Sequence, residues 1–257
     1  GRDGARPLQA AEEAGPQGAG PGSLPVPWFR GVTLYSVLAG LCPLIPVPFL
    51  DDRALAAVKR TMVRDLARQR GVALSPLQVD YLAGTYRVPR GFWEWLGRTA
   101  VALTVKLAGK LFRKIVFVFA IKEGVDTASR AFHEGYLLHL LFDPAEPATE
   151  APRDDLAAWH ARWALAGAVS EIDPRPVNQA IRRAFRGRRG AMRQGARVLG
   201  RSIRSQGAGA AAELPAAEEE RLLGGVGDRL AAELWQERGY LAELEARFLR
   251  WVAAARP

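Results

Sequence analysis

The stretch GVTLYSVLAGLCPLIPVPFLDD, residues 31–52, decides how this chain can fold, because twenty uncharged residues precede its two aspartates. Twenty residues of helix, at ~1.5 Å each, would be long enough to span a bilayer. Pro43, Pro46 and Pro48 prevent this, because proline lacks an N–H and restricts the backbone of the residue before it. Regular helix can therefore cover only about residues 31–42 of the stretch, roughly 18 Å of a hydrocarbon core of ~30 Å.

The proline-rich corner, residues 42–50, has two possible surroundings. It is either buried in protein, or it forms a re-entrant or interfacial wedge whose turn is covered by other helices. In both cases a helix from Trp28 to Leu41 ends here, and the prolines form the turn of a helical hairpin. Asp51 or Asp52 is the expected N-cap of the next helix, because a short acidic side chain accepts hydrogen bonds from the free N–H groups of a first turn.

No window of the sequence shows the period-two alternation of a strand, which predicts an all-α fold, a helical bundle built from helical hairpins. Residues 1–27 are rich in Gly, Ala and Pro and are expected to form a disordered arm. After the arm we expect an apolar helical domain that could associate with a membrane (28–142), a linker (143–155), a helix followed by an arginine-rich amphipathic helix (156–205), a second linker (206–220) and a C-terminal amphipathic helix (221–254).

A second apolar stretch, residues 99–121, contains Lys106, Lys110, Arg113 and Lys114. A charged residue at the centre of a transmembrane helix raises the free energy of membrane insertion by ~2.5–3.5 kcal/mol, and an apolar residue lowers it by only ~0.3–0.6 kcal/mol. This stretch should therefore not span a bilayer alone. Lys106, Lys110 and Arg113 follow helical spacing and form one cationic stripe. Such a stripe suits an amphipathic helix on an anionic membrane surface, or the solvated face of an ordinary soluble helix.

Positive charge is concentrated in residues 175–204, where ten arginines occur without a lysine or an acid, in a chain of net charge +9. We predict a helix over residues 176–205 with a narrow apolar seam beside a broad cationic face. The arginines expected to bind anions there are Arg182, Arg186, Arg189, Arg193, Arg197 and Arg204. The planar fork of arginine suits phosphate in lipid headgroups or nucleic acid. The plain alternatives are a solvated helix face and the high arginine content that GC-rich coding sequences produce.

The final predicted helix, residues 221–254, has leucines and aromatic residues at alternating spacings of three and four. Gly239 and the glycines near the start of this helix argue against a long independent coiled coil. The seam from Leu230 to Val252 therefore packs either within the fold or against a second copy of the chain as a homodimer.

The sequence contains no catalytic, metal or cofactor motif, and the single cysteine, Cys42, excludes an intrachain disulfide. The three histidines, which form no close metal-ligand pair, are His133, His139 and His160. Four polar residues are expected to share one helix face: Glu123, Asp126, Arg130 and His133. They could act in acid–base catalysis, although a row of salt bridges on the helix surface is the ordinary alternative. We expect a protein that is not an enzyme and holds no cofactor.

Residues 37–75, VLAGLCPLIPVPFLDDRALAAVKRTMVRDLARQRGVALS, combine small apolar residues, a Pro-x-Pro turn, an acid and a helix with a Met-Val step and a terminal glycine. This pattern resembles the start of an uncharacterised helical domain family that accompanies Era-like and dynamin-like GTPases in bacteria. The matching residues are Pro46-Val47-Pro48, Asp51, Met62-Val63 and Gly71, with a loose echo at Thr127 and Gly135. The family's Gly-rich turn before that second half is poorly matched, and the resemblance covers residues 32–142 at most.

The resemblance implies a link to the bacterial inner membrane and a separate GTPase as partner, because this chain has no GTPase motifs of its own. It carries over no catalytic residue. Together with the cationic helices, it predicts a helical scaffold or adaptor at the cytoplasmic face of the inner membrane, peripheral or re-entrant, that contacts anionic lipid or a partner protein. The alternative is a soluble cytoplasmic protein that uses the arginine-rich helix on the phosphates of nucleic acid.

Overall fold

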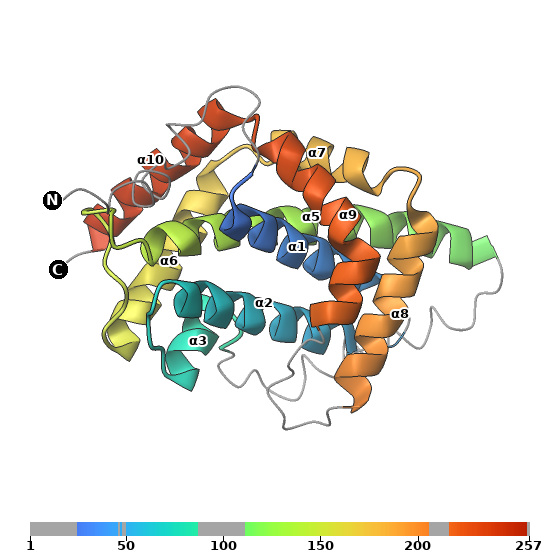
Figure 1. Cartoon of the computed structure of the whole chain (residues 1–257), viewed down its shortest axis with the longest axis horizontal. Coiled ribbons are helices and arrows are strands. Elements are labelled where there is room, and N and C mark those ends of the chain that lie inside the picture. Colours follow the sequence, from blue (N-terminus) through green and yellow to red (C-terminus); the bar gives the residue numbers. More distant parts are fainter. Residues whose placement is uncertain (1–24, 46, 48–49, 87–110, 206–215, 256–257) are drawn as a thin grey trace, which may run out of the picture.

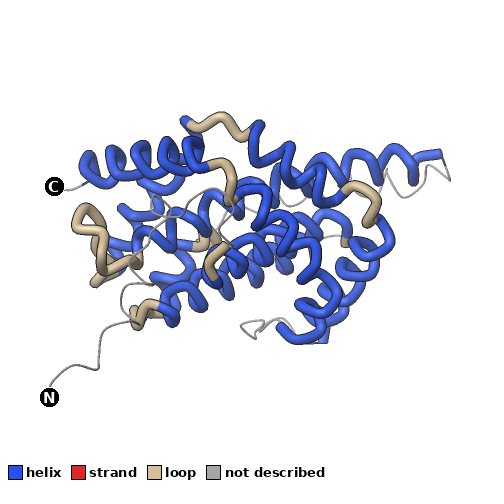
Figure 2. Tube along the Cα trace, turned by 45° about the horizontal axis from the view of Figure 1, so that its top comes forward, coloured by secondary structure: helices blue, strands red, loops and turns tan. Residues whose placement is uncertain are grey.

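The computed structural model describes residues 25–45, 47, 50–86, 111–205 and 216–255. These residues contain helices and no strand, which confirms the all-α prediction (Figure 2). The predicted arm, residues 1–27, lies outside the described residues except for its last three positions. In chain order the elements are α1 (Pro27–Leu41), the 3-10 turn η2 (Cys42–Leu44), α2 (Leu50–Gln69), α3 (Pro76–Leu82), α5 (Leu111–Leu141), α6 (Asp155–Glu171), α7 (Arg175–Phe185), α8 (Arg189–Ser205), α9 (Ala216–Leu234) and α10 (Arg238–Ala255).

Helix α1 lies at the centre of the bundle, where it contacts α2, α5, α8 and α9 (Figure 1). It is apolar on nearly every side, and a helix with that pattern is stable only when other helices surround it. Its buried hydroxyls, Thr33 and Ser36, donate hydrogen bonds to backbone carbonyls, so no polar atom of these side chains is left unsatisfied. Within the described part of the chain, no helix is both long enough and apolar enough to cross a membrane.

Two glycines let α1 and α5 approach each other closely. A Cβ atom added at Gly40 would lie 2.8 Å from the carbonyl oxygen of Gly124, and one added at Gly124 would lie 2.5 Å from the carbonyl oxygen of Gly40. Real Cβ atoms do not occupy such positions, so any larger residue would push the two backbones apart. The close contact between α1 and α5 therefore depends on both glycines.

The proline-rich corner turns the chain from α1 into α2, as predicted. Pro43 lies in the 3-10 turn η2, whereas Pro46 and Pro48 lie outside the described residues. Helix α2 begins at Leu50, so the expectation that Asp51 or Asp52 is the N-cap is wrong, because both aspartates lie inside the first turn. In that position they still face the positive end of the helix dipole and stabilise the helix start.

Both long amphipathic helices predicted for the C-terminal half are divided. The predicted helix 176–205 breaks after Phe185, where Gly187 has φ of +78°, a left-handed conformation that glycine adopts without steric cost. The predicted helix 221–254 breaks at residues 235–237, where Trp235 is buried with its ring 4.9 Å from that of Phe29. Helix α9 also starts at Ala216, inside the range predicted as the linker 206–220.

The apolar seam of the C-terminal region packs within the chain. Leu230, Leu234, Leu241, Leu244 and Phe248 are all buried in the same core as α1 and α5. Helix α9 supplies the contact with α1, and α10 lies against α6. Of the two alternatives for this stretch, packing within the fold therefore accounts for these five residues.

A buried ionic cluster joins α2, α5 and α6. The Glu134 carboxylate receives Lys59 Nζ at 2.6 Å and Arg162 Nη1 at 3.0 Å, and the Glu134 side chain is only 4% exposed. Burial alone would raise the pKa of Glu134, but the two cations outweigh that effect and hold the pKa below its ordinary value. The carboxylate therefore stays charged in the core and ties three helices together.

Candidate anion-binding groove

A groove with a volume of about 810 Å³ lies where the proline-rich corner meets α8. Its apolar side is formed by Ile45, Val47 and Leu50, and its other side by residues of α8. The α8 residues that line it are Gly190, Arg193, Gln194, Ala196, Arg197, Gly200, Arg201 and Arg204. In the view of Figure 1, α8 occupies the right side of the bundle, away from α6 and α10.

The sequence of α8 sorts its side chains onto two faces. Met192, Ala196, Leu199 and Ile203 are buried in the core and fix the helix against its neighbours. The groove arginines follow at intervals of four, four and three residues, so they share one stripe beside that apolar face. They are Arg193, Arg197, Arg201 and Arg204, and all four are exposed.

The corner and α8 are held in contact through Gly200. A Cβ atom added there would lie 3.2 Å from Ile45 Cγ2 and 3.8 Å from Leu50 Cδ2, so only glycine allows the present spacing without some adjustment. Gly195, on the core side of α8, packs in the same way against Leu41 and Leu223. These contacts fix the cationic and apolar sides of the groove relative to each other.

The groove is strongly positive. Among the described residues no acidic side chain lines it, and residues 175–205 contain no acid. Asp51 and Asp52 follow Leu50 in the first turn of α2, and even with both counted, four positive charges stand against two negative ones. Guanidinium forks bind phosphate oxygens in pairs, so this arrangement favours a phosphate-bearing ligand with an apolar part.

The structure brings together only some of the arginines that the sequence predicted to bind anions. Arg193, Arg197 and Arg204 line the groove, whereas Arg182 and Arg186 are exposed at α7 and its C-terminal end and do not line it. Arg189 lies at the first position of α8, and Arg113 lies in α5. Lys106 and Lys110 lie outside the described residues.

Arg201 was missing from the predicted set, although it lies eight residues after Arg193 on the same stripe. Arg201 follows Arg197 by four residues and precedes Arg204 by three, the same helical spacing that links the predicted arginines, so the sequence alone could have placed it beside them.

The polar constellation on α5 is split by the structure. Glu123, Asp126 and Arg130 line a smaller pocket of about 420 Å³, but His133 does not line it. His133 is buried and its Nε2 lies 2.6 Å from the Tyr240 hydroxyl, and burial lowers the pKa of His133 to about 4. The four residues therefore do not form one acid–base site in this structure.

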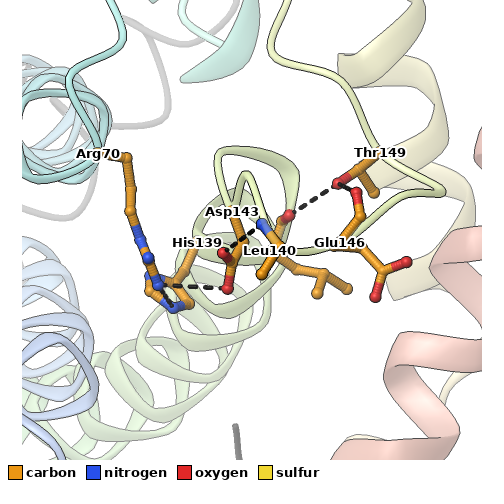
Figure 3. A network of polar contacts seen from close by, with 7 residues as sticks. Arg70, His139, Leu140, Asp143, Glu146 and Thr149 are labelled. Atoms are coloured by element: carbon orange, nitrogen blue, oxygen red, sulfur yellow. Dashed lines mark hydrogen bonds and ion pairs between the residues drawn. The ribbon is translucent and has the colours of Figure 1, made fainter. Parts of the chain in front are cut away.

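His139 belongs to a polar network at the end of α5 (Figure 3). Arg70 Nη2 lies 2.9 Å from His139 Nε2 and 3.3 Å from the Asp143 carboxylate, and the Trp28 ring stacks on the imidazole at 3.6 Å. Burial, together with the Arg70 charge, lowers the pKa of His139 to about 3. The network fastens the start of α1 and the loop after α5, where Thr149 donates to the Leu140 carbonyl. Among the residues that the structure describes, no group of His, Cys, Asp and Glu could hold a metal ion.

A different face of the bundle exposes large apolar side chains. They lie on α3, just after it and on α6: Leu77, Tyr86, Leu156, Trp159 and Trp163. Trp163 makes an edge contact with Trp251 of α10, at 4.7 Å between ring centres. None of these five side chains lines the groove at α8, whose arginines beside apolar residues make it the stronger candidate site.

In comparisons with known proteins, no family model, no curated protein and no solved structure matches the chain. The GTPase-linked resemblance of residues 32–142 therefore stays a prediction from the sequence.

Proposed function

We propose that this protein is a non-enzymatic helical adaptor that docks on an anionic membrane surface through the groove at α8. The observation that carries the proposal is the row of four exposed arginines beside the apolar, proline-rich corner. In keeping with the resemblance, the protein would act at the cytoplasmic face of the inner membrane and present its other faces to a partner such as a separate GTPase.

The apolar side of the groove favours lipid over nucleic acid. The arginines would suit the phosphates of lipid or of nucleic acid. A sugar–phosphate backbone, however, offers no hydrocarbon group to pack against Ile45, Val47 and Leu50. A membrane interface offers phosphates and hydrocarbon within a few ångströms of each other, which is the combination that the groove presents.

The charge alone is sufficient for useful binding. Each basic residue near an anionic leaflet contributes about 1 kcal/mol, so the four groove arginines together contribute about 4 kcal/mol, on the order of a thousandfold in affinity. Because this attraction is electrostatic, it should weaken as salt is added.

Vesicle co-sedimentation tests the proposal. The full chain should bind vesicles of phosphatidylglycerol mixed with phosphatidylcholine, and the variant Arg193→Gln, Arg197→Gln, Arg201→Gln, Arg204→Gln should lose most of that binding. The matched control removes four exposed arginines that do not line the groove: Arg68→Gln, Arg153→Gln, Arg229→Gln and Arg250→Gln. Each of these forms a surface ion pair of small energetic worth, so the control should fold and bind like the wild type.

Two results would overturn the proposal. Absence of binding to anionic vesicles at low salt would remove the membrane as partner, and tight binding of duplex DNA under those conditions would put nucleic acid in its place. Equal loss of binding in the groove variant and in the control would show that overall charge, and not the groove, recruits the protein.

A further inference from the structure

We infer that the groove at α8 binds the headgroup of one anionic phospholipid, with its phosphate among the arginines and the first carbons of its acyl chains beside Ile45, Val47 and Leu50. This inference rests on the proposed function but is narrower, because a protein can approach a charged membrane surface without enclosing any lipid molecule.

The dimensions of the groove suit a single lipid headgroup. Its volume of about 810 Å³ falls within the ~300–1,000 Å³ of typical small-ligand sites. The arginine row runs from residue 193 to residue 204, roughly 16 Å along the helix axis at ~1.5 Å per residue. A phosphate can therefore contact two neighbouring guanidinium groups while the rest of the molecule lies along the corner.

The groove is preformed. Gly200 holds the corner against α8 through Ile45 and Leu50, and both of these side chains are themselves part of the core. At the other end of the groove, a Cβ atom added at Gly190 would meet nothing within 4 Å, which leaves the backbone of α8 open to a ligand. A ligand that fits this shape binds without first reorganising the protein.

The chemistry of the two sides selects the occupant. Inorganic phosphate or glycerol phosphate would satisfy the arginines and leave Val47, which is half-buried, in contact with water. A phospholipid would cover Val47 as well, and each buried CH₂ group contributes about fourfold in affinity. Two or three such groups would make a short-chain lipid bind on the order of tenfold or more better than its bare headgroup.

Titration of the full chain with water-soluble ligands tests the inference. Dihexanoyl phosphatidylglycerol, kept below its micelle concentration, should bind on the order of tenfold or more tighter than glycerol phosphate, and dihexanoyl phosphatidylcholine should bind more weakly than the anionic lipid. Isothermal calorimetry gives each affinity, and this comparison needs no variant of the protein.

Two matched variants locate the acyl chains. Val47→Asn should reduce the affinity for dihexanoyl phosphatidylglycerol several-fold and leave that for glycerol phosphate unchanged. Val72→Asn changes another half-buried valine, outside the groove, and should alter neither affinity. Circular dichroism confirms that both variants fold.

The outcomes separate this inference from the proposed function. If anionic vesicles still recruit the protein through the arginine row but the short-chain lipid binds no better than glycerol phosphate, the inference fails and the proposed function stands. If the vesicles do not recruit the protein either, both fail. Displacement of the short-chain lipid by an acidic peptide that binds more tightly would also overturn the inference, because the occupant would then be a protein.

Discussion

The interior and the α8 face of this bundle treat charge in opposite ways. At the centre, Glu134 is enclosed between Lys59 and Arg162, so the negative charge is compensated by two cations from neighbouring helices. On the α8 face, four arginines line a groove, and no acidic side chain in the described part of the chain lines it. The buried charges tie three helices together, whereas the charges of α8 are exposed along a groove.

The largest expected effect is on the buried cluster. Glu134→Ala would leave Lys59 and Arg162 beside an empty space without their anion, and breaking a buried pair in this way typically lowers the free energy of unfolding by about 3–5 kcal/mol. Urea denaturation measures the change. Glu243→Ala, which removes an exposed partner of Arg247, is the control and should cost no more than about 0.5 kcal/mol. Equal effects of the two substitutions would contradict a structural role for the cluster.

Acid should destabilise the interior through its two buried histidines. The folded-state pKa values are about 4 for His133 and about 3 for His139, below the ordinary value of 6.5. Between pH 6.5 and 4 the unfolded chain therefore binds protons that the folded chain does not, and stability falls as the pH falls. The free energy of unfolding should drop by about 2 kcal/mol per histidine between pH 7 and pH 5.

Urea denaturation at both pH values measures that drop, and His133→Gln should remove roughly half of it, since one of the two groups is then gone. The low pKa of Glu134 acts in the same direction at still lower pH, because its carboxylate stabilises the fold only while charged. A free energy of unfolding that is unchanged between pH 7 and pH 5 would show that the histidines are accessible to protons in the folded state.

An intermediate effect is expected where α1 meets α5. Gly124→Ala would place a methyl group 2.5 Å from the Gly40 carbonyl oxygen, and overpacking of this kind costs about 1–3 kcal/mol. Gly31→Ala, in α1, meets nothing within 4 Å and should instead stabilise the helix by up to about 1 kcal/mol. Thermal unfolding followed by circular dichroism compares the two variants, and a shift of the same sign in both would contradict the close packing of α1 on α5.

The smallest effect on stability is expected on α8. Arg193→Gln with Arg197→Gln should change the free energy of unfolding by no more than about 0.5 kcal/mol, because both side chains are exposed. Binding to anionic vesicles should nevertheless weaken about 30-fold, from two charges at about 1 kcal/mol each. Arg182→Gln with Arg186→Gln removes the same charge outside the groove and should weaken binding less. Equal weakening by both pairs would assign recruitment to net charge.

Local rules were enough to predict the hairpin at the start of the fold. The prolines after residue 42 end α1 and start a turn whatever lies around them, and the uncharged residues 31–41 of α1 already favoured surroundings without water or charge. The apolar and cationic sides of α8 were also readable, because helical spacing alone separates them.

The remaining features depend on partners far apart in the sequence. The break before α10 places Trp235 against Phe29, and the buried cluster joins Lys59 with Glu134 and Arg162, pairings that no local pattern reveals. Gly187 could equally have stayed inside a helix, because an isolated glycine only weakens one. The groove itself requires the corner and α8 to meet, so the sequence could indicate its two sides but not their contact.

The cationic side chains that line the groove are arginines and not lysines, and this choice has a practical consequence. The five lysines of the chain all lie between positions 59 and 122, so α6 to α10 contain none. Amine-reactive dyes and cross-linkers therefore have no lysine to modify on α8. The protein can be labelled on its lysines while every side chain of the groove stays chemically intact, which makes fluorescence measurements of vesicle and lipid binding possible without disturbing the surface under test.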